Sequence, residues 1–159
     1  MVRVPYVSRD ELDSEGQKIY DRIREDRGTE EVGLQFRALL NSPQSAGHLT
    51  SLGASLRFQS SMPENLKELA IILVAREWDS DIEWTGHSIL AAKAGVSDGS
   101  IEAIRTHKTA DGLTNDETVV SKFVHEMIRD KKVSDGTYAE VEKLVGPVSY
   151  THLTLPTKA

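Results

Sequence analysis

The sequence of 159 residues contains no cysteine. This absence excludes disulfide bonds, thiolate metal ligands and thiol redox chemistry, because each of these needs a cysteine sulfur. Apolar runs are short, and none approaches the roughly 20 residues that a membrane-crossing helix needs. The first residues, MVRVPYVSRDEL, lack the apolar segment of a secretory signal. We therefore expect a cytoplasmic protein that has no membrane partner.

Positive charge and phosphate-binding motifs are also scarce. The 19 Lys and Arg residues are outnumbered by 25 Asp and Glu residues, and the formal net charge is −6. Nucleic-acid binding needs a basic face for phosphate contacts, so we expect no nucleic-acid partner. The sequence contains no glycine-rich phosphate loop, no GxSxG nucleophile elbow and no HExxH motif of a zinc protease.

What the sequence does contain is helical periodicity. Apolar residues recur at spacings of three and four, and no strand-like alternation competes with them. The segment after Pro63 is apolar almost all round, so we expect it to be the central helix. The sequence predicts an all-α fold with a single domain over 1–146. The expected helices lie before Gly28, over 43–58, after Pro63, over 82–94, after Ser97, after Thr114 and over 134–145.

Local signals mark several ends of these helices. Ser14 with Gln17, and Thr114 with Glu117, have the spacing of capping boxes, in which a hydroxyl and a carboxylate or amide satisfy free backbone N–H groups. Gly28 follows the first periodic segment, where a left-handed residue commonly ends a helix. We therefore predict two capped helix starts and one glycine stop.

The last residues, PVSYTHLTLPTKA over 147–159, depart from this pattern. They have no helical period and no charge before Lys158. The string VSYTHLTLPT resembles the read-through translation of a transposon-type sequencing adapter. We therefore expect 147–159 to be a non-native tail on a sequence cut near Gly146, and we assign His152 no function. The alternative is a disordered natural terminus.

The stretch AREWDSDIEWTGH over 75–87 carries most of the evidence on function. Glu83 and His87 are four residues apart, so on a helix they share a face. A carboxylate beside an imidazole orients the ring and fixes its tautomer, which makes a usable general acid or base. Ser80 lies on the same side, and an antiparallel hairpin would bring Glu68 to it. The sequence therefore predicts a pocket built from Glu68, Ser80, Glu83 and His87, with Trp78 and Trp84 as its walls.

Two other interpretations of these residues remain open. Glu83 and His87 could be an exposed ion pair, worth roughly 0.2–0.5 kcal/mol and without a chemical role. They could also bind a metal together with Glu68, in which case all three side chains would converge on one point. The HExxH motif and the paired Glu-x-x-His motif of di-iron bundles are absent, so we expect no metal.

The remaining charged residues receive ordinary structural interpretations. Glu77, Asp79 and Asp81 are predicted to form a solvated turn, in which Asp79 or Asp81 caps the next helix. The other histidines have no partner at a useful spacing, and we expect each to lie at the surface or to fill the core: His48, His107 and His125.

The segment 68–104, ELAIILVAREWDSDIEWTGHSILAAKAGVSDGSIEAI, resembles the carboxymuconolactone decarboxylase family, whose all-helical fold is shared with the alkylhydroperoxidase AhpD. The motif that carries the resemblance is EW-x-x-H-x-x-x-A-x-x-A-G-V-S over 83–97. The similarity extends from about Tyr20 to about Val145. It implies an AhpD-like helical bundle that assembles into homo-trimers or homo-hexamers.

In the peroxidase branch of this family the active site has the spacing Glu-x11-Cys-x2-Cys-x3-His. The same spacing here contains Glu68, Ser80, Glu83 and His87, so serine and glutamate replace the two cysteines. A thiol peroxidase needs one thiolate to attack the peroxide and a second thiol to resolve the product. Thiol peroxidase activity is therefore excluded.

The resemblance then implies lyase chemistry on a small carboxylated lactone or a related acid. His87 would be the acid or the oxyanion donor, Glu83 would orient it, Glu68 would complete a proton relay, and Trp84 would form a wall. No cofactor is expected, because the lactone itself accepts the electrons. The alternative is a catalytically silent helical oligomer that binds a small hydrophobic acid. Arginines that could bind a substrate carboxylate are Arg57, Arg76 and Arg105.

Overall fold

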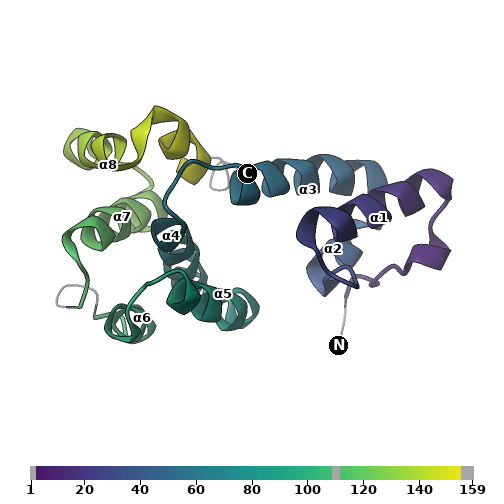
Figure 1. Cartoon of the computed structure of the whole chain (residues 1–159), viewed down its shortest axis with the longest axis horizontal. Coiled ribbons are helices and arrows are strands. Elements are labelled where there is room, and N and C mark those ends of the chain that lie inside the picture. The colour runs from purple at the N-terminus through teal and green to yellow at the C-terminus, as the bar shows by residue number, and fades with distance from the viewer. Residues whose placement is uncertain (1–2, 109–111, 155–159) are drawn as a thin grey trace. The chain divides into compact units, whose positions relative to one another are not determined.

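The computed structural model describes residues 3–108 and 112–154 (Figure 1). Its regular elements in this part of the chain are all helices, with no strand, so the predicted all-α fold is confirmed. Each helix described falls short of the length or the apolarity needed to cross a bilayer. The elements in chain order are η1 (Arg9–Glu11), α1 (Ser14–Arg27), α2 (Leu34–Leu39), α3 (Pro43–Phe58), α4 (Glu64–Glu77), α5 (Asp81–Lys93), α6 (Asp98–Arg105), α7 (Asn115–His125), the π-helix η2 (Glu126–Asp130) and α8 (Asp135–Thr154).

The chain divides into two compact units, Met1–Ser60 and Ser61–Ala159, called here the N-terminal and the C-terminal unit. In the N-terminal unit, α3 packs against both α1 and α2. This unit has its own apolar core, which comes from α1, α3 and the residues that flank α2: Ile19, Ile23, Val32, Leu40 and Ala46.

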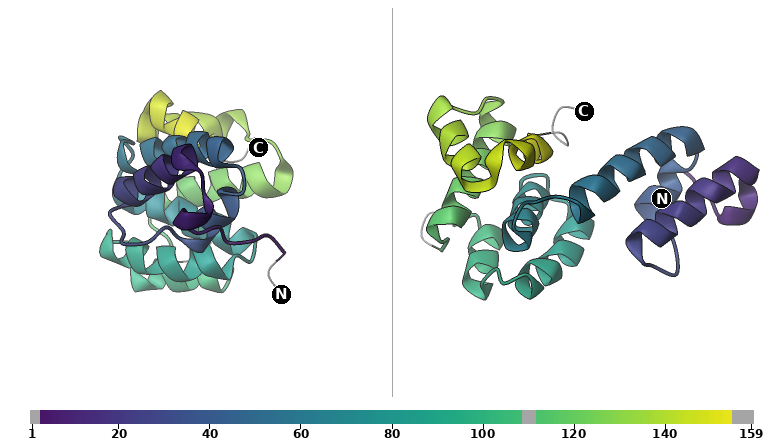
Figure 2. Two further views of the ribbon diagram at one scale, coloured as in Figure 1. Left: turned by 90° about the vertical axis from the view of Figure 1, so that its right-hand side faces the viewer. Right: turned by 45° about the horizontal axis from the view of Figure 1, so that its top comes forward.

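The C-terminal unit is built around α4. This helix packs against α5, α6 and α7, and α7 packs in turn against α8 (Figures 1 and 2). Most apolar side chains of α4 are buried, including Leu69 and Ile72 at 0% exposure. The predicted central position of this helix is therefore confirmed. Because α4 is surrounded, polar residues on it meet side chains from several other helices.

The helix ends follow local capping chemistry, with one correction. Gly28 ends α1 in the left-handed conformation, at φ 60°, and Thr114 with Glu117 forms the predicted capping box. The predicted box of Ser14 with Gln17 is wrong. Asp13 is the cap, because its carboxylate lies one residue earlier and accepts the N–H of Gly16 at 2.8 Å.

The end of the chain is helical further than the periodicity indicates. The backbone of α8 breaks at Gly146, where φ is 76° and ψ is 166°, and then continues as helix to Thr154. Ser149 in this second part is fully buried and lies 3.0 Å from the hydroxyl of Ser61. The domain over 1–146 and the non-native origin of 147–159 stay predictions. Residues 155–159 and the side chain of His152 lie outside the described structure.

Candidate functional site

The predicted acid–base residues meet between α4 and α5. Glu68 lies in the second turn of α4, and His87 lies midway along α5, which packs on α4. The Nδ1 atom of His87 is 2.8 Å from Oε2 of Glu68, and its Nε2 atom is 3.3 Å from Oε2 of Glu83. The structure therefore brings together all three residues that the sequence analysis proposed as catalytic.

Exposure rises steadily across these three side chains. The side chain of Glu68 is 1% exposed, that of His87 is 19% exposed and that of Glu83 is 45% exposed. A buried carboxylate needs hydrogen-bond partners to offset its lost hydration, and the imidazole supplies one. The ring thus has one nitrogen held in the interior and the other beside a solvent-accessible carboxylate. Such an arrangement can transfer a proton between solvent and a bound molecule.

The metal interpretation requires a different geometry. The carboxylates of Glu68 and Glu83 lie at opposite nitrogens of the His87 ring, so the three side chains do not point to one shared position. Within 3–108 and 112–154, no group of three or more His, Asp or Glu side chains is arranged to hold a metal ion.

The other predicted pocket residues have different surroundings. Ser80 precedes α5, and its carbonyl accepts the N–H of Trp84 at 2.9 Å. Trp84 is partly buried against the core of the C-terminal unit, whereas Trp78 is 68% exposed at the end of α4. Ser80 and Trp84 thus lie in the same turn as Glu83, and Trp78 lies outside that turn.

The predicted cap of α5 is wrong. Ser80, and neither Asp79 nor Asp81, occupies the position before the helix. Asp79 adopts the left-handed conformation at φ 48°, which aspartate tolerates better than most residues. Its carboxylate is 80% exposed and lies 3.2 Å from Nη1 of Arg76.

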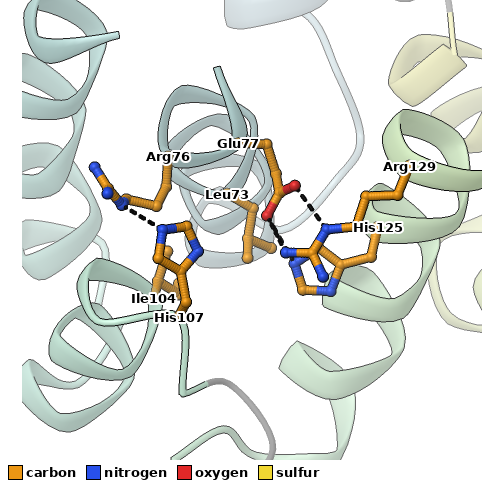
Figure 3. Close-up of a pocket in the computed structure, with 7 residues that line it drawn as sticks. All are labelled: Leu73, Arg76, Glu77, Ile104, His107, His125 and Arg129. Carbon is orange, nitrogen blue, oxygen red and sulfur yellow. Dashed lines mark hydrogen bonds and ion pairs between the residues drawn. The ribbon is translucent and has the colours of Figure 1, made fainter. Parts of the chain in front are cut away.

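A second group of polar side chains was not predicted. It lines a cavity of about 100 Å³ at the C-terminal end of α4, which we call the charged cavity (Figure 3). Arg76 and Glu77 come from the last turn of α4, His107 from the turn after α6, His125 from the end of α7, and Arg129 from η2. Its apolar lining consists of Leu73 and Ile104.

Glu77 is the anionic residue of this cavity, and its predicted place in a solvated turn is wrong. Its side chain is only 9% exposed. Arg129 donates from Nε to Oε2 at 2.8 Å and from Nη2 to Oε1 at 2.5 Å. These hydrogen bonds hold the pKa of Glu77 below its ordinary range, against the opposing effect of burial. Glu77 is therefore an ionised residue with both oxygens occupied.

Two histidines of the cavity are paired, although their sequence spacing gave neither of them a partner. His107 is exposed, so its prediction as a surface residue is confirmed, whereas His125 is half-buried. Nε2 of His107 accepts a hydrogen bond from Nε of Arg76 at 3.1 Å, so the ring is neutral and carries its proton on Nδ1. Nε2 of His125 is 3.4 Å from Oε1 of Glu77. Burial and the charge of Arg129 lower the pKa of His125. His48, by contrast, is exposed on α3, as predicted.

One sequence signal could have indicated this cavity. His125 and Arg129 are four residues apart, which places two basic groups on one helical face. Two basic side chains on one helical face repel each other unless an acidic side chain from another part of the chain lies between them. The acid is Glu77, 52 residues from Arg129, and no spacing rule connects them.

No protein-family model and no curated protein matches this chain. The relation to the carboxymuconolactone decarboxylase family therefore depends on the motif over 83–97 and on the helical fold. It is a proposal.

Proposed function

We propose that this chain is a cofactor-independent lyase of the carboxymuconolactone decarboxylase type, with an AhpD-like fold, acting on a small carboxylated lactone or a related acid. The observation that supports this most strongly is the imidazole of His87 held between two carboxylates, 2.8 Å from Glu68 and 3.3 Å from Glu83. A ring held at one nitrogen has a defined orientation and tautomer. It can therefore deliver a proton to a fixed position.

The two carboxylates take different roles in this proposal. Glu68 is the more buried and makes the shorter contact, so it is the positioning residue. Glu83 is the more exposed and lies beside Nε2, so it exchanges protons between the ring and solvent. This is the reverse of the roles that the family spacing suggests, in which Glu83 orients the ring and Glu68 completes the relay.

The chemical step follows from these roles. The bond between the lactone ring and the substrate carboxylate breaks, and CO2 leaves. The electron pair passes through the ring alkene into the lactone carbonyl, which becomes a dienolate. In this step His87 carries a proton on each nitrogen, the Nδ1–H facing the carboxylate of Glu68. Its Nε2 proton moves to carbon, and Glu83 then returns a proton to the ring from solvent. Overall, one proton replaces one carboxylate, and no external electron acceptor is needed.

Two of the three arginines considered for the substrate carboxylate are engaged elsewhere in the C-terminal unit. Arg76 belongs to the charged cavity, and Arg105 is held by both oxygens of Glu102. Arg57 lies on α3 in the N-terminal unit. The proposal therefore assigns this role to none of the three.

The apolar surface of α5 supports self-association. Ile82 is 77% exposed, Ile89 is 56% exposed and Leu90 is 37% exposed, and Trp78 lies exposed just before this helix. Clustered apolar side chains of this size commonly mark protein interfaces. We propose a cytoplasmic homo-oligomer, a trimer or hexamer, which covers this surface. The same surface fits the alternative, a silent oligomer that binds a small hydrophobic acid.

Turnover of lactone acids tests the lyase proposal. Absorbance of the substrate chromophore is followed for the wild type, for His87→Gln and for the matched control His48→Gln, whose histidine is exposed on α3. Loss of a general acid lowers kcat by about 10²–10⁴-fold, while the control retains activity. Circular dichroism confirms that both variants keep their helices.

A third variant separates positioning from proton transfer. Glu68→Gln should lower kcat and also change its pH profile, because the ring loses its charged partner. If His87→Gln turns over the lactone acid as fast as the wild type does, the lyase proposal is contradicted. A wild type that binds a hydrophobic acid and sediments as an oligomer, yet turns over no lactone acid, supports the silent oligomer.

A further inference from the structure

The charged cavity lies at the opposite end of α4 from His87 and has no part in the lyase proposal. Its volume of about 100 Å³ is well above the roughly 10–15 Å³ that a single water molecule needs on the same kind of measure. This is room for a carboxylate group or an inorganic oxyanion. The side chains of Arg76 and Arg129 are 31% and 53% exposed, so the cavity can be reached from solvent.

The lining offers hydrogen-bond donors and almost no free acceptor. The only carboxylate among its described residues is Glu77, and Arg129 occupies both of its oxygens. With both histidines neutral, two guanidinium groups and one carboxylate leave an excess of one positive charge. Asp79 offsets Arg76 only weakly, because its carboxylate is 80% exposed to solvent. A small anion suits such a lining, and a cation does not.

The ring of His107 adds a further hydrogen-bond donor to the lining, its Nδ1–H group. Arg76 donates to Nε2 of this ring and so places the ring proton on Nδ1. In Figure 3 the other ring nitrogen of His107 lies on the side that faces Glu77 and His125 across the cavity. Arg76 therefore acts through His107, and the N–H that it fixes is available to a ligand.

The backbone is unusual at two places in this lining. His107 adopts a left-handed conformation at φ 56°, and Arg129 belongs to the π-helix η2. π-helical turns and left-handed residues other than glycine are found more often than chance at functional sites. Here these two backbone features orient the side chains of His107 and Arg129, which carry the N–H donors of the cavity.

We propose that the charged cavity binds a small oxyanion, either a carboxylate or inorganic phosphate, through the Nδ1–H of His107 and the guanidinium of Arg129. Arg76 is a positioning residue for His107. Guanidinium groups suit this ligand class because their planar N–H pairs match two oxygens.

Binding should take up a proton on His125. Glu77 from α4, Arg129 from η2 and His107 from the turn after α6 face this ring. A bound anion adds negative charge beside the neutral ring and favours its protonated form. The affinity for an oxyanion should therefore be higher at pH 6 than at pH 8.

The test uses the full chain at constant ionic strength, with acetate and inorganic phosphate as separate probes. The NMR signals of the histidine rings are followed as each probe is added, and variants assign the signals. The expected result is a saturable shift of the His107 and His125 signals with at least one probe. If only acetate shifts these signals, the site binds planar carboxylates. If only phosphate shifts them, the site binds tetrahedral anions.

Matched variants separate a site from a general charge effect. Arg76→Gln should weaken binding about tenfold, while Arg105→Gln, the same change at an exposed ion pair, should alter it less than twofold. His107→Asn, which tolerates the left-handed backbone, should also weaken binding about tenfold, and His48→Asn should not. Circular dichroism checks the fold of each variant.

The same titration on His87→Gln distinguishes this proposal from the lyase proposal. That variant should bind the probe as the wild type does, whatever its effect on turnover. The proposal is overturned if neither probe shifts the His107 and His125 signals, or if Arg105→Gln weakens binding as much as Arg76→Gln.

Discussion

At the scale of single residues, Glu77 gives the clearest consequence of the structure. Its carboxylate joins the last turn of α4 to η2 through two hydrogen bonds from Arg129. Glu77→Gln removes the charge and weakens both bonds, so we expect the free energy of unfolding to fall by about 1–3 kcal/mol at pH 7. Urea denaturation measures this change. Glu102→Gln, at an exposed ion pair, serves as the control and should have a much smaller effect.

The contribution of Glu77 also depends on pH. Its pKa in the folded protein lies below the ordinary value of 4.5. Its stabilising effect is therefore complete above pH 4.5 and is lost as the pH falls through the lower folded pKa. The stability difference between the wild type and Glu77→Gln should stay constant from pH 6 to 8 and close in acid. A difference that persists in acid would show that the charge of Glu77 is not the cause.

His125 predicts a second pH effect with the same sign. Burial and Arg129 place its pKa in the folded protein below the ordinary value of 6.5. The unfolded chain therefore binds a proton more readily, and the wild type loses stability as the pH falls from 6.5 through the folded pKa. His125→Gln cannot take up this proton. Thermal denaturation should show the variant gaining stability relative to the wild type between pH 8 and pH 5; an unchanged difference contradicts the assignment.

At the scale of elements, the start of α7 combines capping with a contact between helices. The carboxylate of Glu117 accepts the N–H of Thr114 at 2.8 Å and the hydroxyl of Ser100, from α6, at 2.9 Å. The hydroxyl of Thr114 accepts the N–H of Glu117 in return, at 3.4 Å. One capping box thus fixes the start of α7 and joins it to α6.

Removing the hydroxyl of this box should lower stability. Thr114→Ala leaves the N–H of Glu117 without its cap, and we expect a loss of about 1 kcal/mol in urea denaturation. Thr118→Ala is the matched control, because Thr118 is exposed within the same helix and alanine has the higher helix propensity. Equal losses in both variants would show that capping is not the cause.

Elements also show what the sequence can predict. Gly28, Ser97 and the pair Thr114 and Glu117 mark helix ends through chemistry within three residues, and their helix ends were predicted correctly. The short helix α2 has six residues and no such signal, and it was not predicted. The cap of α1 was predicted at Ser14, whereas Asp13, one residue earlier, is the cap. Serine and aspartate both suit this position, so residue type alone does not distinguish them.

The two candidate sites differ in the same way. His87 and Glu83 share one helical turn, and Glu68 lies on the preceding helix, so a hairpin argument was enough to place them together. The charged cavity joins Arg76 to His107, 31 residues away, and Glu77 to Arg129, 52 residues away. Those contacts depend on how α4, α6 and α7 pack, which periodicity does not specify.

At the scale of the whole molecule, each compact unit has a separate apolar core among the described residues. Residues 61–159 expressed alone should therefore keep their helical circular dichroism and unfold cooperatively in urea. Residues 1–60 alone should be marginal, because a chain of about 60 residues buries too little of its surface. A non-cooperative transition of 61–159 would show that its core needs the N-terminal unit.

The central helix α4 links the two candidate sites through its geometry. Glu68 and Glu77 are nine residues apart, which is two and a half helical turns, so they project from opposite sides of the helix, about 14 Å apart along its axis. Inserting or deleting one residue between them would rotate one site by about 100° against the other. In homologous chains that retain both carboxylates, substitutions in this interval should be tolerated far more readily than any change in its length.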